Sequence, residues 1–226
     1  MTVRDEFEAF AEAGRDREME DEHWPTAKPI LSRMPVESGD RVLDLGTGSG
    51  YAARALSGAA DARSAVGLDA APEMAHTASS HTDDPAVEFV AGDFHELPFQ
   101  PNSFDHCFSM EAFFFATDPL EALGEILRIL RPGGTVFCAV NFYEANHYSH
   151  VWADRLDPEM LLWSAAQYRG AFREAGFHVA AQSQVPDRET AIPSADAFPT
   201  GEFETRAEMV ERYRELGTLL TVGVAP

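Results

Sequence analysis

The sequence has almost no lysine and a large excess of acidic residues. Lys28 is its only lysine, and 17 lysine and arginine residues face 38 aspartate and glutamate residues among 226, for a formal net charge of −21 at pH 7. No basic stripe is present that could neutralise a row of phosphates. We therefore expect no nucleic-acid partner.

The acidic residues are spread along the whole chain instead of being gathered in a tail. A dispersed acidic surface resembles the surfaces of proteins from salt-accumulating halophiles, in which concentrated salt screens the repulsion between carboxylates. We therefore expect a halophilic source.

Cysteine and long apolar runs are scarce as well. Cys107 and Cys138 both lie in apolar runs, so we expect buried, reduced thiols and no disulfide framework. Two cysteines cannot form a thiolate cluster, and we predict no metal site. Because no run of about 18 apolar residues or signal peptide is present, we expect a cytoplasmic protein without a membrane partner.

From residue 41 onward, apolar runs of strand length alternate with segments of helix length. Strands that alternate with helices pair in parallel through right-handed crossovers. The sequence therefore predicts an α/β fold with a doubly wound, mostly parallel seven-stranded sheet. The strands are expected at residues 41–45, 64–68, 87–91, 104–110, 135–140, 177–181 and 218–224.

Two segments outside this alternation are predicted to cover the sheet. Residues 1–35 should form a helical N-terminal cap, with an amphipathic helix that ends in a loop at His23-Trp24-Pro25 and a second short helix. The main domain should span residues 36–226. Its irregular, aromatic-rich stretch at about 141–160 predicts a lid inserted into that domain.

The strongest motif is Gly46-Thr47-Gly48-Ser49-Gly50, which directly follows the apolar strand at 41–45. Glycines at alternate positions let the backbone turn tightly and let a ligand approach main-chain atoms. At the carboxyl edge of a parallel sheet, this loop predicts a ligand site. A dinucleotide fingerprint would need a third glycine where this chain has Tyr51.

Three successive strands end in an aspartate. Asp44 stands two residues before the first glycine, where it suits a ligand with a cationic or hydrogen-donating group. Asp69 can accept both hydroxyls of a ribose. Asp93 can accept from an exocyclic amine, beside Phe94, which could pack on a purine.

These residues resemble class I S-adenosylmethionine-dependent methyltransferases, in particular the group similar to menaquinone and ubiquinone C-methyltransferases. The resemblance covers about residues 36–140 and includes Gly67–Met74, Val87–Pro98, Asn102–Asp105 and Leu130–Thr135. It implies S-adenosylmethionine as cofactor and a small-molecule methyl acceptor as partner. The cofactor-binding residues implied are Asp44, Gly46, Thr47, Gly48, Gly50, Asp69, Ala70, Met74, Asp93, Phe94, Ser109 and Met110.

Methyl transfer from a sulfonium mainly requires alignment and desolvation, with a base only where the acceptor holds a proton. Candidates for this catalytic work are Glu111, after the fourth strand, and Tyr143, His147 and His150 in the irregular segment. Ser109–Phe115 replaces the Asn/Asp-Pro-Pro-Tyr/Phe signature of DNA and protein-glutamine methyltransferases. That difference disfavours a base or amide nitrogen as acceptor.

Two other functions stay open at this point. A nicotinamide-dependent oxidoreductase is disfavoured by the Gly-x-Gly-x-Gly spacing and by Asp93. A non-catalytic S-adenosylmethionine-binding module is compatible with an intact cofactor site. The sequence leaves open whether carbon, oxygen or nitrogen is methylated, and it leaves the oligomeric state open.

Overall fold

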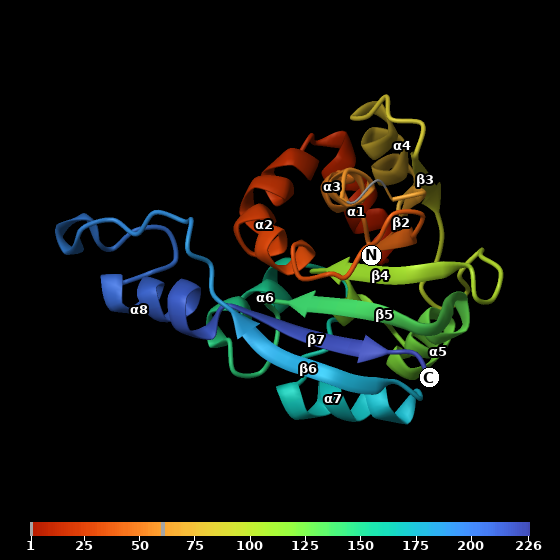
Figure 1. The fold of residues 1–226 in the computed structure, drawn as a ribbon. Helices are drawn as coiled ribbons and strands as arrows, with labels where there is room; N and C mark the ends of the chain where they lie inside the picture. The colour runs from red at the N-terminus through yellow and green to blue at the C-terminus, as the bar shows by residue number, and fades with distance from the viewer. Residues whose placement is uncertain (1, 60–61) are drawn as a thin grey trace.

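The computed structural model describes residues 2–59 and 62–226 and contains the predicted seven-stranded sheet (Figure 1). The strand order is β3-β2-β1-β4-β5-β7-β6. Strands β1 to β5 are parallel, and β7 is antiparallel to both β5 and β6. The strands are β1 (Arg41–Leu45), β2 (Ser64–Asp69), β3 (Val87–Ala91), β4 (Phe104–Met110), β5 (Leu130–Val140), β6 (His178–Val185) and β7 (Thr218–Val224).

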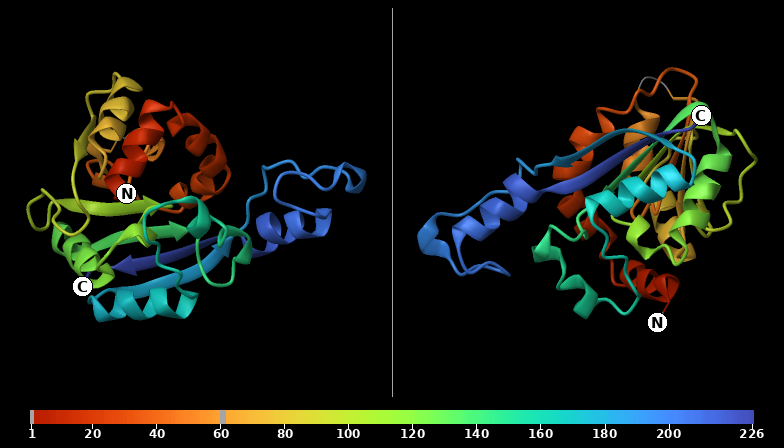
Figure 2. Two further views of the ribbon diagram at one scale, coloured as in Figure 1. Left: turned by 180° about the vertical axis from the view of Figure 1, so that it is seen from behind. Right: turned by 90° about the horizontal axis from the view of Figure 1, so that it is seen from below.

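The connections between the strands are mainly helical, as the alternation predicted. Between β6 and β7, residues 186–217 extend from the end of the sheet as an arm that carries α8 (Figure 2). The α-helices are α1 (Val3–Glu12), α2 (Asp16–Leu31), α3 (Tyr51–Ser57), α4 (Pro72–Ser80), α5 (Pro119–Ile129), α6 (Trp152–Arg155), α7 (Ala165–Glu174) and α8 (Arg206–Val210). Shorter turns are η1 (Phe113–Phe115), η2 (His147–Ser149), η3 (Ala195–Ala197) and the π-helical η4 (Glu211–Leu216).

Both faces of the sheet are covered, because successive side chains of a strand point to opposite faces. Val42 of β1 packs in one buried cluster with residues of α2 and α3. Its neighbour Leu43 packs in the other cluster with residues of α5 and α7. Cys107 and Cys138 are buried free thiols in the second cluster. The doubly wound prediction is therefore confirmed.

The predicted loop at His23-Trp24-Pro25 is wrong, because helix α2 continues through it with Pro25 and Pro29 inside the helix. Each proline removes a backbone hydrogen bond. Packing offsets this loss, since Ala27 and Ile30 of the same helix are completely buried against the sheet and α3. Met1, the first residue of the predicted cap, lies outside the described residues.

None of the helices formed by residues 2–59 and 62–226 combines the length and the hydropathy that a membrane span requires.

Candidate functional site

A cavity at the carboxyl ends of β1, β2 and β4 encloses about 660 Å³ of non-protein space, part of it open to solvent. The strand order reverses between β1 and β4, and open α/β sheets bind ligands at such a point. One side of the cavity, here called the sheet wall, consists of Asp44, Gly46, Thr47, Gly48, Ser49, Tyr51, Asp69, Ala70, Phe94, Met110, Glu111, Ala112 and Phe115. The other side, the cap wall, consists of Val3, Phe7, Asp16, Met19, Glu20 and His23 from α1 and α2.

The glycine loop needs its glycines for two different reasons. Gly46, Gly48 and Gly50 all have positive φ angles, of 76°, 52° and 81°, which L side chains adopt at a cost. A Cβ at Gly46 would lie 2.2 Å from the Cβ of Ala112, whereas a Cβ at Gly48 would meet no protein atom within 4 Å. The loop therefore packs tightly at Gly46 and leaves room for a ligand at Gly48.

Asp69 is held in place by backbone donors at the end of β2. Its Oδ2 accepts from the N–H of Gly48 at 3.0 Å, and its Oδ1 accepts from the N–H of Ala71 at 3.0 Å. Burial raises the pKa of this carboxyl, and the same backbone N–H groups lower it. A fixed carboxylate beside an open glycine backbone fits a ligand that carries a pair of hydroxyls.

Asp44 has a structural task in the loop as well as a place on the sheet wall. Its Oδ2 accepts from Thr47 Oγ1 at 2.6 Å and from the N–H of Ala53 at 3.1 Å. Burial raises the pKa of Asp44 to about 7, with the hydrogen bond from Thr47 acting against the shift. Asp44 thus ties the end of β1 to the loop and to α3.

Eight of the twelve predicted cofactor-binding residues line the cavity: Asp44, Gly46, Thr47, Gly48, Asp69, Ala70, Phe94 and Met110. The other four do not. Gly50 is packed beside the ring of Phe89, Met74 is fully buried in α4, and Ser109 is buried in β4. Asp93 accepts from the backbone and ring of His95, at 2.8 and 2.5 Å. A cofactor contact for these four stays a prediction.

Glu111, on the sheet wall, combines a positive φ angle with a buried carboxyl group. Its φ angle is +55°, its exposed fraction is 9%, and its Oε1 accepts from the N–H of Asn141 at 2.6 Å. Its Oε2 is buried without a hydrogen-bond partner. Burial raises the pKa of Glu111 to about 8, against the positive charge of Arg212 and the N–H of Asn141. The sequence predicted Glu111 as a catalytic candidate after the fourth strand, and the structure places it on the cavity lining with its carboxyl buried.

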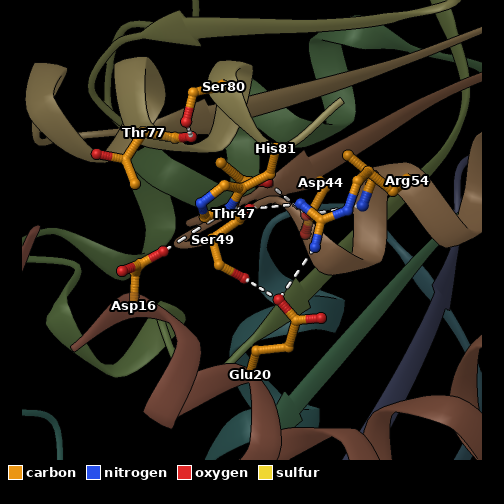
Figure 3. A network of polar contacts seen from close by, with 10 residues as sticks. Asp16, Glu20, Asp44, Thr47, Ser49, Arg54, Thr77, Ser80 and His81 are labelled. Atoms are coloured by element: carbon orange, nitrogen blue, oxygen red, sulfur yellow. Dashed lines mark hydrogen bonds and ion pairs between the residues drawn. The ribbon is translucent and has the colours of Figure 1, made fainter. Parts of the chain in front are cut away.

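The cap wall is joined to the glycine loop by side chains of α2 (Figure 3). Glu20 Oε2 accepts from Ser49 Oγ at 2.8 Å and from Arg54 Nη2 at 3.0 Å. Arg54 Nη1 also donates to the carbonyl of Ser49 at 2.6 Å. Asp16 lies 3.8 Å from His81 Nδ1. These contacts hold the cap against the loop that the sequence assigned to ligand binding.

No residue of the predicted N-terminal cap was among the predicted site residues, although the cap forms one wall of the cavity. His23, within the wrongly predicted loop, lines the cavity, and burial lowers its pKa to about 4, so that the imidazole is neutral. The spacing of Asp16, Glu20 and His23, at intervals of four and three residues, places them on one face of a helix. This spacing could have predicted that the three side chains face the cavity together. Pro25 instead indicated a loop, so the helix was not expected to continue through it.

The segment predicted as a lid at about 141–160 contributes none of the described residues that line the cavity. Tyr143 is buried elsewhere, with its hydroxyl donating to the carbonyl of Leu216 at 2.9 Å. His147 is exposed and packs on Tyr148, and His150 Nε2 lies 3.4 Å from the carbonyl of Tyr143. The structure therefore does not place these three candidates on the lining of the cavity with Glu111.

Comparison with known proteins identifies the family of this chain. The methyltransferase domain family matches residues 43–138. A protein described as a methyltransferase, solved in complex with the Haloferax volcanii Trm112 methyltransferase activator, is 56% identical, with both chains covered completely and a TM-score of 0.97. The chain belongs to the methyltransferase family.

More distant relatives agree with this assignment. A malonyl-[acyl-carrier protein] O-methyltransferase of Pectobacterium atrosepticum is 35% identical over 57% of this chain and 49% of its own. A demethylmenaquinone methyltransferase of Staphylococcus epidermidis is 34% identical over 52% and 50%. The chain spans about a third to a half of the length of the first curated relatives that it matches.

These findings confirm S-adenosylmethionine as the cofactor of this methyltransferase and support a halophilic origin. They give no support to a nicotinamide oxidoreductase. The expected list of partners was wrong, because it held a small-molecule acceptor and no protein, while the 56% identical chain was solved with a protein activator. A surface that binds a folded protein has no short sequence motif comparable to the glycine loop.

Proposed function

We propose that this chain transfers the methyl group of S-adenosylmethionine to an acceptor bound in the same cavity. The observation that carries the proposal is the continuity of that cavity, which joins the glycine loop and Asp69 to the buried carboxyl of Glu111. Donor and acceptor would thus be held next to each other in a largely dry space, which is what a displacement of this kind requires.

The residues of the sheet wall divide this work. Asp69 would accept the ribose hydroxyls, the open backbone at Gly48 would pass close to the methionine portion, and Phe94 would pack on the adenine. When bound, S-adenosylmethionine supplies a methyl group on a positively charged sulfur. Glu111 would hold the acceptor and take up a proton where the acceptor has one to lose.

Calorimetry in concentrated potassium chloride tests the cofactor. We expect micromolar binding of S-adenosylmethionine and S-adenosylhomocysteine in separate titrations, and no heat from NAD. Binding of NAD alone would contradict the proposal. Binding of both adenosyl compounds without any methyl transfer to components of a cell extract would identify a non-catalytic binding module.

We further propose that the chain works with a Trm112-type activator. Support comes from the identity of 56% over the full length of a chain that was solved with such an activator. The test is co-expression with Haloferax volcanii Trm112, followed by size-exclusion chromatography with light scattering in concentrated potassium chloride. A joint peak with the summed mass is expected, and separate elution of the two proteins would refute the partnership.

A further inference from the structure

The ionised side chains among the described lining residues of the cavity are acidic. Five of its described lining residues carry a carboxyl group, and none of those lining residues is a lysine or an arginine. His23 is kept neutral by burial, which lowers its pKa to about 4. Arg212 is close enough for its charge to act on Glu111, but it does not line the cavity. An anion in this space would find no counter-charge on the lining.

Most of these carboxyl groups already have partners. Asp44 accepts hydrogen bonds from Thr47 and Ala53, and Asp69 accepts hydrogen bonds from Gly48 and Ala71. Glu20 accepts hydrogen bonds from Ser49 and Arg54. Asp16 has one oxygen without a hydrogen bond, yet that oxygen lies 3.8 Å from the His81 ring. Glu111 is therefore the described lining residue that has a buried carboxyl oxygen with neither a hydrogen bond nor an ion pair.

The backbone conformation and two hydrogen bonds from backbone N–H groups fix the position of Glu111. A residue other than glycine at a φ of +55° costs free energy and persists only where its surroundings hold it. Here the N–H of Glu111 donates to the carbonyl of Ala139 at 2.9 Å, and the N–H of Asn141 holds Oε1. These bonds leave Oε2 as a buried acceptor without a donor, which is costly unless a ligand supplies one.

Much of the remaining lining is apolar, although it also includes Tyr51, whose pKa is raised by burial and by the charges of Asp44 and Glu111. Val3, Phe7 and Met19 come from the cap, and Ala112 and Phe115 follow Glu111 in the chain. A carboxylate or phosphate acceptor placed there would lose its hydration and face an acidic neighbour. An amine would instead supply the missing hydrogen-bond donor, and a protonated amine beside Glu111 would favour the ionised carboxylate over the neutral acid that burial favours in the empty site.

We infer that the group methylated by this enzyme is an amine on an apolar body, which Glu111 holds through Oε2, and that carboxylate and phosphate acceptors are rejected. This inference rests on the proposed methyl transfer. The amine nitrogen gives its lone pair to the methyl carbon, and the pair of the breaking carbon–sulfur bond returns to sulfur. The proton shed by the methylated nitrogen passes to Glu111 Oε2.

The chemical stability of the transferred label tests this assignment. The protein, alone and with Haloferax volcanii Trm112, is incubated with a heat-treated cell extract and S-adenosylmethionine labelled in its methyl group. Mild base releases methyl esters as volatile methanol, whereas an N-methylated amine survives and is retained by a cation exchanger. We expect retained, base-stable label, reduced about 10²-fold in Glu111→Gln and unchanged in Glu174→Gln, which alters an exposed carboxylate of α7.

Each other outcome contradicts a different statement. Volatile label, or stable label that passes through the exchanger, overturns the amine assignment and leaves methyl transfer standing. Retained label with full activity of Glu111→Gln removes Glu111 from the acceptor site. Absence of label with the wild-type protein, with and without Trm112, overturns the proposed function itself.

A binding measurement provides a readout that does not depend on turnover. The protein saturated with S-adenosylhomocysteine is titrated with 2-phenylethylamine and with 3-phenylpropanoate, which share an aromatic body and differ in charge. We expect the amine to bind at least about tenfold more tightly, and we expect Glu111→Gln to abolish that preference. Equal affinities, or tighter binding of the carboxylate, would overturn the inference.

Discussion

The two walls of the cavity are built in different ways. On the sheet wall, Asp44 and Asp69 are buried and held by backbone N–H groups. On the cap wall, Glu20 is joined to Arg54 by side chains that keep 31% and 24% of their surface exposed. These sheet-wall carboxylates are thus part of the core, while the polar contact between Glu20 of the cap wall and Arg54 is partly solvated.

This difference indicates which side chains contribute most to the free energy of unfolding. Desolvated carboxyl groups such as Glu111 change stability strongly with protonation, whereas partly exposed ion pairs contribute little. We therefore expect substitutions on the sheet wall to have large effects on stability or cofactor affinity. Substitutions of the cap contacts should have small ones.

The largest effect is expected from Glu111→Gln on the pH dependence of stability. Because the pKa of Glu111 is raised to about 8 in the folded state, the wild-type protein should lose stability as the pH rises from about 4.5 to about 8. The variant escapes this loss and should be more stable above pH 8, by about 3 to 5 kcal/mol. Urea unfolding from pH 5 to 9 measures the difference, and parallel curves for the two proteins would contradict the burial of an unpaired carboxyl.

The next largest effect on stability is expected from Gly46→Ala. Its Cβ would fall 2.2 Å from the Cβ of Ala112, so the free energy of unfolding should drop by about 2 to 4 kcal/mol. Gly48→Ala is the matched control, since it shares the positive φ and has open space around its Cβ. It should lose only about 1 to 2 kcal/mol of stability but should weaken cofactor binding. Equal losses of stability in the two variants would refute the difference in packing.

Asp69→Ala probes the affinity of the sheet wall for its cofactor. Removal of the carboxylate leaves the ribose hydroxyls without acceptors, so S-adenosylmethionine should bind more weakly by about 1 to 3 kcal/mol. Calorimetry measures the loss, with Glu174→Ala as a control at an exposed site on α7. Unchanged affinity in Asp69→Ala would remove Asp69 from the ribose site.

The smallest effect is expected on the cap wall. Glu20→Gln weakens the contacts to Arg54 and Ser49 and should lower the free energy of unfolding by at most about 1 kcal/mol, less in concentrated salt. His147→Ala, in the segment that does not line the cavity, should change it by less than about 0.5 kcal/mol. A loss of several kcal/mol in Glu20→Gln would show that the cap is as integral to the fold as the sheet.

Much of the sheet wall could be predicted because its signals are local. The glycines of the loop, Asp44 and Asp69 stand next to one another or at the end of a recognisable strand, and the strands themselves alternate in a regular order. Backbone conformations such as the positive φ of Gly46 and Gly48 depend on a few neighbouring residues. The predicted residues that line the sheet wall therefore followed from these short-range patterns.

Local signals were not sufficient for the other residues. Pro25 indicated a loop, and only the burial of Ala27 and Ile30 keeps α2 helical through it. Tyr143, His147 and His150 have side chains suited to catalysis, yet none of the three lines the cavity. The type of a side chain does not indicate which surface it will face.

The sequence by itself determined the doubly wound sheet, the glycine loop, the carboxylate that ends β2 and the acidic surface, because each depends on neighbouring residues or on composition. The tertiary structure decided that α1 and α2 form one wall of the cavity and that Glu111 is desolvated with one oxygen unpartnered. Those features depend on contacts between distant residues, such as Glu20 with Arg54 and Glu111 with Asn141. Burial and charge environment are properties of the assembled fold, because they depend on every group that packs around a residue.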